Sequence, residues 1–138
     1  MISLRLAERL RASGLPWHPS SGDRFVVPGR DMDADVFVIS DMTVEVQELV
    51  DRSVIGFNGT TEWALDSLEV EQVLWLPREH QLRELLGAHV VSLEARDGTA
   101  RVTVEAQGVR SSVDDTDVEC AYAAALLALR ERPGELAR

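Results

Sequence analysis

One hairpin constrains the fold of this chain more than any other stretch. Residues 89–106 read HVVSLEARDGTARVTVEA, in which Asp97-Gly98 separates two runs that alternate apolar and polar residues. A period of two is typical of strands that bury one face. Asp-Gly favours a two-residue type I′ turn, because both central residues of that turn take positive φ. The sequence therefore predicts a β-hairpin, and with it an antiparallel sheet.

Four further stretches have the composition of short strands, being rich in Val, Ile or Phe: RFVVP, DVFVIS, MTVEVQELV and SVIGFN. Helical periodicity, with its start and stop signals, predicts helices over residues 3–13, around 61–69, 78–86 and 117–131. We predict an α+β fold. In it, a single-layer, largely antiparallel sheet of five to six strands packs with N-terminal, middle and C-terminal helices.

The length and composition fit one domain. At 138 residues and 45% hydrophobic content, the chain is long enough to bury a single core. Its one cysteine, Cys120, cannot form an internal disulfide. We expect residues 1–138 to form a single α+β domain, with residues 133–138 as a flexible tail.

The last predicted helix is apolar on nearly every side. It opens with Thr116-Asp-Val-Glu119, which matches a capping box, and continues as CAYAAALLALRER. A helix that is apolar all round must be covered on most of its surface. We expect this cover to come either from the N-terminal helix or from the same helix of a second copy. The second case would make the protein a homodimer through its Ala-rich C-terminal helix.

The charge is concentrated in the middle of the chain. Residues 31–71 contain eleven acids and one basic residue, Arg52. The net charge of this segment is therefore −10, which equals the formal net charge of the whole chain. Phosphates would be repelled by such a surface, so we expect neither nucleic acid nor a membrane as a partner. A basic protein partner fits this segment, and a charged surface that only keeps the protein soluble is the alternative.

Several common chemistries are absent from the sequence. All fourteen basic residues are Arg, which excludes Schiff-base lysines and the lysine of a phosphate loop. Asp31, Asp33 and Asp35 in DMDAD lack the Gly and Glu that a calcium loop needs at its sixth and twelfth positions. We interpret them as a solvated turn, and we expect no catalytic residue, no metal and no cofactor.

The histidines and the cysteine also lack a reactive setting. His18, His80 and His89 have no partner at the spacing of zinc ligands. Cys120 is expected to be buried at a helix start beside Asp117 and Glu119, where carboxylates disfavour a thiolate.

The stretch GFNGTTEWALDS, residues 56–67, is the candidate site. Asn58-Gly59 can take left-handed conformations, and a threonine can cap the helix that follows, so a structural junction explains the stretch. The alternative is a pocket wall formed by hydroxyls, exposed amides and an indole face. The candidate binding residues are Asn58, Thr60, Thr61, Glu62, Trp63 and Asp66.

The cellular location is predicted from two features. The N-terminal MISLRLAERLRASG carries charges inside its apolar pattern, unlike a signal peptide. The longest apolar run, residues 120–129, is about half of what a bilayer requires of a helix. We expect a cytoplasmic protein without a transmembrane segment.

Long phrases of the chain, taken in order, resemble a family of small proteins from high-GC bacteria: DRFVVPGR, VFVISDMTVEV, IGFNGTTEWALDSLE, VLWLPREHQLRELLG and AYAAALLAL. Members have about this length, so the resemblance covers essentially the whole chain. They are often labelled pilus assembly proteins, and the resemblance implies no assigned activity and no catalytic residues. We interpret the label as a mis-transfer, because the ATPase-like proteins of pilus assembly need a Gly-rich phosphate loop that this chain lacks.

The sequence therefore favours a non-catalytic accessory or binding protein that acts through protein contacts. Its acidic face at residues 31–71 would meet a basic partner. The alternative is a small-ligand-binding or hydrolase-like protein that uses the loop at residues 58–66.

Overall fold

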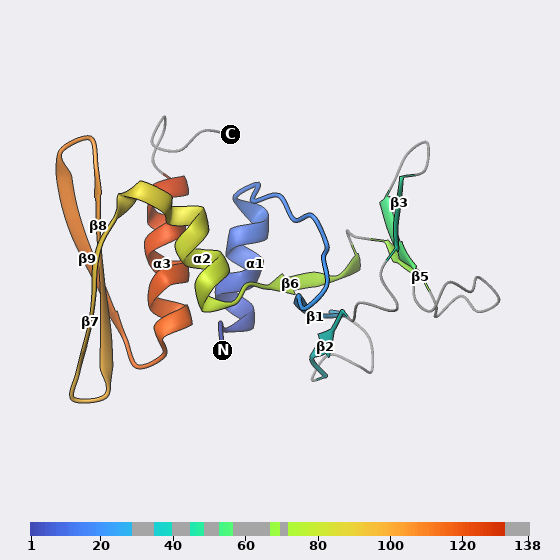
Figure 1. The fold of residues 1–138 in the computed structure, drawn as a ribbon, viewed down its shortest axis with the longest axis horizontal. Helices are drawn as coiled ribbons and strands as arrows, with labels where there is room; N and C mark the ends of the chain where they lie inside the picture. Colours follow the sequence, from blue (N-terminus) through green and yellow to red (C-terminus); the bar gives the residue numbers. More distant parts are fainter. Residues whose placement is uncertain (29–34, 40–44, 49–52, 57–66, 70–71, 132–138) are drawn as a thin grey trace. The chain divides into compact units, whose positions relative to one another are not determined.

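The computed structural model describes residues 1–28, 35–39, 45–48, 53–56, 67–69 and 72–131 (Figure 1). The chain divides into two compact units, which are described separately below. Unit 1 combines Met1–Leu15 with Pro77–Arg138, and unit 2 is Pro16–Leu76. The prediction that the whole chain is one domain stays a prediction, and its proposed tail lies beyond the described residues. No described helix is both long enough and apolar enough to cross a membrane.

Unit 1 contains three α-helices and one sheet. Its elements, in chain order, are α1 (Leu4–Ala12), α2 (Glu79–Leu86), the 3₁₀ turn η3 (Gly87–His89), β7 (Val90–Arg96), β8 (Thr99–Ala106), β9 (Val109–Asp115) and α3 (Val118–Arg130). The helices predicted over residues 3–13, 78–86 and 117–131 are confirmed to within two residues at each end.

The sheet of unit 1 is an antiparallel meander in the order β7-β8-β9. The predicted Asp97-Gly98 turn is confirmed, since φ is 53° at Asp97 and 76° at Gly98. A second turn of the same kind follows at Gln107 and Gly108, with φ of 51° and 78°. This turn and strand β9 were not predicted from the sequence, because Gln-Gly is a weaker turn signal than Asp-Gly.

Helix α3 is covered within its own unit. It packs against β8 and β9 on one side and against α1 and α2 on the other, so that it lies between the sheet and the other two helices (Figure 1). Tyr122 and Leu126 are 1% exposed. Of the two sources of cover that the sequence left open, the N-terminal helix is confirmed, together with α2 and the sheet.

The predicted capping box of α3 is wrong by one residue. The N-cap is Asp117, whose Oδ1 accepts the backbone N–H groups of Glu119 and Cys120 at 2.8 and 3.1 Å. The carboxylate of Glu119 accepts the N–H of Ile2 and the N–H of Glu79, and thereby ties α3 to the starts of α1 and α2. The local hydrogen bond that a capping box would give Glu119 was predicted, and the structure shows contacts to two other segments of the chain.

Unit 2 consists of short strands. They are β1 (Arg24–Val26), β2 (Phe37–Val38), β3 (Glu45–Glu48), β4 (Ser53–Gly56), β5 (Ser67–Glu69) and β6 (Leu74–Leu76). They form two antiparallel sheets, in the orders β2-β1-β6 and β3-β4-β5. The expected single sheet of five to six strands is therefore not confirmed, since the described strands form three sheets of three. The α+β class is confirmed.

Two local predictions in unit 2 also change. A helix was expected around residues 61–69, but residues 67–69 form strand β5 instead, and there Leu68 lies opposite Ile55 of β4. The rest of that helix lies outside the described residues. Strand β6, which was not predicted, pairs with β1 across almost fifty residues, with Trp75 opposite Phe25. The periodicity of a short stretch of sequence cannot show such a long-range pairing.

Candidate functional site

The six candidate residues of the sequence analysis all fall in residues 57–66, outside the described residues: Asn58, Thr60, Thr61, Glu62, Trp63 and Asp66. The pocket and the structural junction therefore both stay predictions. Asp31 and Asp33 also lie outside the described residues, and Asp35 is exposed.

The described residues point to another candidate, the outer face of the β7–β9 sheet. Side chains alternate between the two faces of a strand. On β8, Val102 and Val104 are buried on the side of α3, whereas Arg101 is exposed on the other side. Figure 1 shows α3 on one face of this sheet and no other described element of unit 1 on the opposite face. We call that opposite face the outer face.

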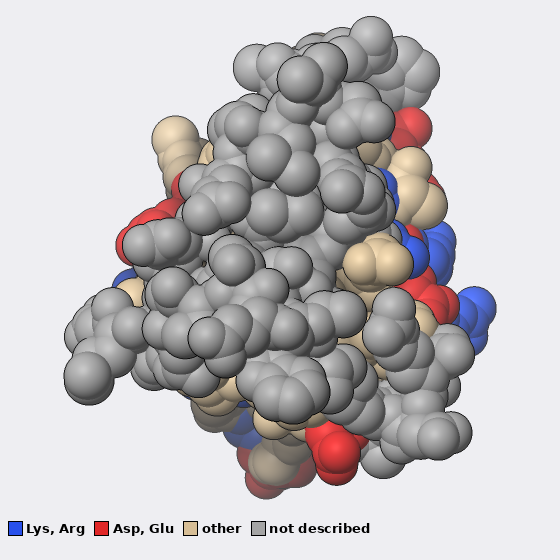
Figure 2. Space-filling view, turned by 90° about the vertical axis from the view of Figure 1, so that its right-hand side faces the viewer, with Lys and Arg blue, Asp and Glu red and all other residues tan. Residues whose placement is uncertain are grey.

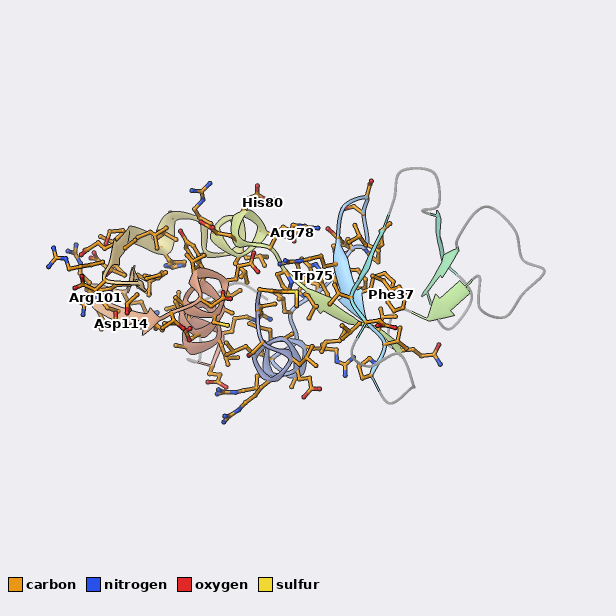
Figure 3. All side chains as sticks on the ribbon, turned by 90° about the horizontal axis from the view of Figure 1, so that it is seen from below. Phe37, Trp75, Arg78, His80, Arg101 and Asp114 are labelled. Carbon is orange, nitrogen blue, oxygen red and sulfur yellow. The ribbon has the colours of Figure 1, made fainter. Side chains whose placement is uncertain are left out.

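The outer face carries a row of alternating charges across its three strands. Glu94 on β7 lies opposite Arg101 on β8, and Arg101 lies opposite Asp114 on β9. Nε and Nη2 of Arg101 donate to the two carboxylate oxygens of Asp114 at 2.7 and 3.0 Å. This two-pronged geometry is the strongest that an exposed ion pair can adopt. Figure 3 shows the two side chains together at the sheet.

Two further cross-strand pairs extend this pattern along the outer face. The Oγ1 of Thr103 and the Oγ of Ser112 lie 2.8 Å apart, and Nη2 of Arg110 donates to Glu105 at 3.0 Å. Figure 2, which draws a different side of the molecule, likewise shows described arginine and acidic side chains beside one another. The side chains of these cross-strand pairs are thus polar and of mixed sign.

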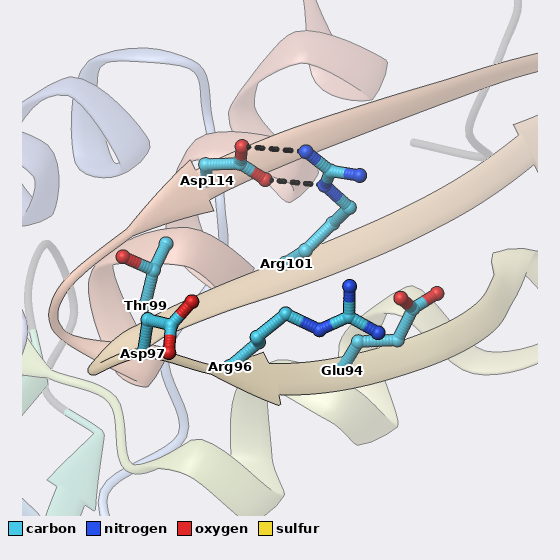
Figure 4. Close-up of a pocket in the computed structure, with 6 residues that line it drawn as sticks. All are labelled: Glu94, Arg96, Asp97, Thr99, Arg101 and Asp114. Atoms are coloured by element: carbon cyan, nitrogen blue, oxygen red, sulfur yellow. Dashed lines mark hydrogen bonds and ion pairs between the residues drawn. The ribbon is translucent and has the colours of Figure 1, made fainter.

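A shallow depression of about 310 Å³ lies at the turn end of this face (Figure 4). Its lining residues come from all three strands and the first turn: Glu94, Arg96, Asp97, Thr99, Arg101 and Asp114. The lining therefore combines three carboxylates, two guanidinium groups and one hydroxyl. Such a surface can bind a polar partner of mixed charge.

The electrostatics of the outer face do not favour acid–base catalysis. The hydrogen bond and the charge of Asp114 raise the pKa of Arg101, with a smaller effect from Glu94. The hydrogen bond from Arg101 lowers the pKa of Asp114. Both groups therefore keep their charge around neutral pH, and neither is poised to exchange a proton there. The Arg101–Asp114 pair therefore places two fixed charges on the outer face and is not suited to transfer a proton.

The other reactive side chains of unit 1 are engaged or inert. Burial raises the pKa of the Cys120 thiol, and the charges of Asp117 and Asp115 add to the shift, so the expected buried thiol is confirmed. Nδ1 of His89 lies 3.0 Å from the backbone oxygen of Glu105. His80 is exposed on α2 (Figure 3). Among the described residues, no group of three His, Cys, Asp or Glu side chains could hold a metal ion.

A cluster of aromatic side chains forms the core of the β2-β1-β6 sheet. The ring of Trp17 stacks on that of Trp75 with centroids 6.0 Å apart, and Phe25 stacks on Phe37 at 5.5 Å. The buried carboxylate of Asp23 accepts the indole N–H of Trp17 at 2.8 Å. These contacts fasten the loop before β1 onto the sheet. We interpret the cluster as a core, because its members pack on one another.

The comparisons with known proteins identify no relative. No protein-family model, no curated protein and no solved structure matches the chain. The resemblance to small proteins of high-GC bacteria therefore stays a prediction.

The outer face was missed from the sequence because β9 was missed. Glu94 and Arg101 belong to the predicted hairpin, but their row needs Asp114 on the third strand. The available signal was Gln107-Gly108 followed by the alternation of Arg110, Ser112 and Asp114 with their neighbours.

Proposed function

We propose that this protein is a non-catalytic binding protein that acts through protein contacts, and that unit 2 docks onto a basic protein partner. The proposal retains the acidic face at residues 31–71 from the sequence analysis. It extends that face to the whole of unit 2, Pro16–Leu76.

The observation that carries the proposal is how the charge divides between the two units. Each unit contains twelve acids, but unit 2 has only three arginines and unit 1 has eleven, so their formal net charges are −9 and −1. Nearly all of the excess charge of the protein thus belongs to one compact unit.

Four acids of unit 1 have structural partners within that unit. Asp114 and Glu105 bind arginines across the sheet, and Asp117 and Glu119 bind helix N-termini. The twelve acids of unit 2 cannot all be neutralised by its three arginines. Excess charge of one sign destabilises a compact unit through self-repulsion, and a partner of opposite sign relieves that repulsion.

The experiment is capture of partners by the tagged protein from lysate of its own cells, with two variants of equal net charge. One variant carries Asp→Asn substitutions at Asp31, Asp33 and Asp35. The other carries Glu→Gln substitutions at the exposed Glu8, Glu84 and Glu131 of unit 1. The proposal predicts one stoichiometric basic protein that wild type and the unit 1 variant retain, and that the unit 2 variant loses.

Salt provides the second arm of the experiment. Exposed charge pairs are screened over about 10 Å at roughly 0.1 M ionic strength, so the captured protein should be released as NaCl rises. Equal capture by both variants, or capture that is insensitive to salt, would show that the acidic unit is not the docking surface. In that case, the negative charge of unit 2 would be explained by its effect on the solubility of the protein.

A further inference from the structure

Strand β7 has a free edge. It is the first strand in the order β7-β8-β9, and within the described residues no strand pairs with its other side. Two of the large apolar side chains that remain exposed lie on it, Val91 at 42% and Leu93 at 41%. An exposed edge of seven residues is a template for pairing with another strand.

The turn fixes which backbone groups point outward from this edge. Arg96 and Thr99 flank the two-residue turn and lie opposite each other. The residues that flank such a turn exchange both backbone hydrogen bonds, and the direction of the N–H groups alternates along each strand. Glu94 and Arg96 therefore bond to β8. The N–H and C=O groups of Leu93 and Ala95 point to the free edge.

We infer that β7 pairs antiparallel with β7 of a second copy of this chain, about a two-fold axis at Ala95. Residues that lie opposite each other in an antiparallel pair have their side chains on the same face of the sheet. The two-fold axis must therefore lie between one residue of β7 and the same residue of the second copy. With the axis at Ala95, Glu94 of each copy lies opposite Arg96 of the other. If the axis lay at Glu94, Glu94 of one copy would face Glu94 of the other, and the two negative charges would repel each other. If the axis lay at Leu93, Glu94 of one copy would face the neutral Ser92 of the other and would gain no charged partner.

This register continues the charge row of the outer face. The row runs Asp114, Arg101, Glu94 within one copy, with signs negative, positive, negative. Arg96 of the second copy supplies the next positive charge, and the two-fold axis repeats the arrangement. Within the described residues, neither Glu94 nor Arg96 forms a side-chain hydrogen bond or ion pair, and Arg96 lies opposite the neutral Thr99. Both charges are thus available to the second copy.

The usual protection of edge strands does not oppose this pairing. The irregularity of β7 lies between Val90 and Ser92, before the three residues of β7 that would overlap, Glu94 to Arg96. Charged residues on an edge disfavour pairing in general, but here they permit one register and penalise its neighbour. The overlap is short, and interfaces well below about 1,200 Å² bind weakly, so the dimer forms and dissociates with concentration.

The test is sedimentation equilibrium of the purified full chain from roughly 10 µM to 1 mM, a range suited to weak interfaces. Wild type is expected to associate to a dimer. Glu94→Arg and Arg96→Glu should each raise the dimer dissociation constant about tenfold or more, because each places like charges opposite each other. An equimolar mixture of the two variants should associate again, since each supplies the charge that the other lost. Arg110→Gln, on the opposite edge strand, is the control and should associate like wild type.

Three results would overturn the inference: a wild type that is monomeric throughout the range, single variants that associate like wild type, or a mixture that fails to associate. Should either reversal unfold, Glu94→Gln and Arg96→Gln replace the pair. Each must then weaken association and reduce its dependence on salt, and unchanged association contradicts the inference. The measurement uses purified protein only, so its outcome is independent of the basic partner proposed for unit 2.

Discussion

The carboxylate of Glu119 in α3 accepts the backbone N–H of Glu79, the first residue of α2, at 3.0 Å. Its other oxygen accepts the N–H of Ile2, next to the start of α1, at 3.1 Å. The first N–H groups of a helix have no partner within the helix, and the N-terminal end carries partial positive charge. One carboxylate thus satisfies donors at the starts of two helices from the first turn of a third.

Removal of this carboxylate should destabilise unit 1. Glu119→Ala leaves the Glu79 and Ile2 donors without their acceptor, and the expected loss is about 2–3 kcal/mol of unfolding free energy. Glu119→Gln keeps an acceptor oxygen but loses the charge, so about half of that loss is expected. Denaturant unfolding followed by far-UV circular dichroism measures both. Glu84→Gln, on the exposed side of α2, is the control, and an Ala variant within 0.5 kcal/mol of it, about the usual effect of a surface substitution, would refute the role.

The stability of unit 1 should fall in acid because of Asp117. Burial acts to raise the pKa of its carboxyl, but hydrogen bonds from the Met1 ammonium group and from the N–H groups of Cys120 and Glu119 outweigh burial, and the pKa is lowered. A lowered pKa in the folded state means stability that is complete above the ordinary value of 3.8 and is lost as the pH falls through the folded value. The difference in unfolding free energy between wild type and Asp117→Asn should therefore shrink below about pH 4. A difference that stays constant from neutral pH into that range would contradict this.

The hydrogen bond between Asp23 and Trp17 should stabilise the β2-β1-β6 sheet. Asp23 is 3% exposed and also accepts the N–H of Ser20 at 3.1 Å. Asp23→Ala leaves the indole N–H without this acceptor and should cost about 1–3 kcal/mol. A double-mutant cycle with Trp17→Phe, read by tryptophan fluorescence during unfolding, should give a coupling energy of about 1 kcal/mol. Additive effects of the two substitutions would show that the bond contributes nothing.

The second hairpin turn can be improved. Gln107 sits at φ 51°, a left-handed conformation that is costly for most side chains but common for Asn. Gln107→Asn produces the Asn-Gly pair that type I′ turns prefer, and it should raise stability by about 0.5 kcal/mol. Thermal unfolding would detect this as a higher Tm. A lower Tm would mean that the Gln107 side chain makes a stabilising contact.

Local signals in the sequence predicted unit 1 well. Helices α1, α2 and α3 follow from periodicity and end signals, and the Asp97-Gly98 turn takes the positive φ values that its residues favour. Strand β9 was missed because its Gln107-Gly108 turn is a weak local signal, and the other failures are non-local. Trp75 pairs with Phe25 across unit 2, and Glu119 accepts the N–H of Glu79 in another helix, so no window of sequence contains both partners. The candidate site at residues 58–66 lies outside the described residues.

Zero-length carbodiimide cross-linking of the captured complex tests whether unit 2 is the docking surface for a basic partner. This reagent joins carboxylates to amines, and the chain contains no lysine, so cross-links from its acids report almost entirely on a partner's lysines. Each unit contains twelve acids, so a difference in cross-linking between the units does not come from the number of carboxylates. Docking through unit 2 should give cross-linked peptides from residues 31–71 and few from unit 1. An even distribution, or one concentrated in unit 1, would contradict it.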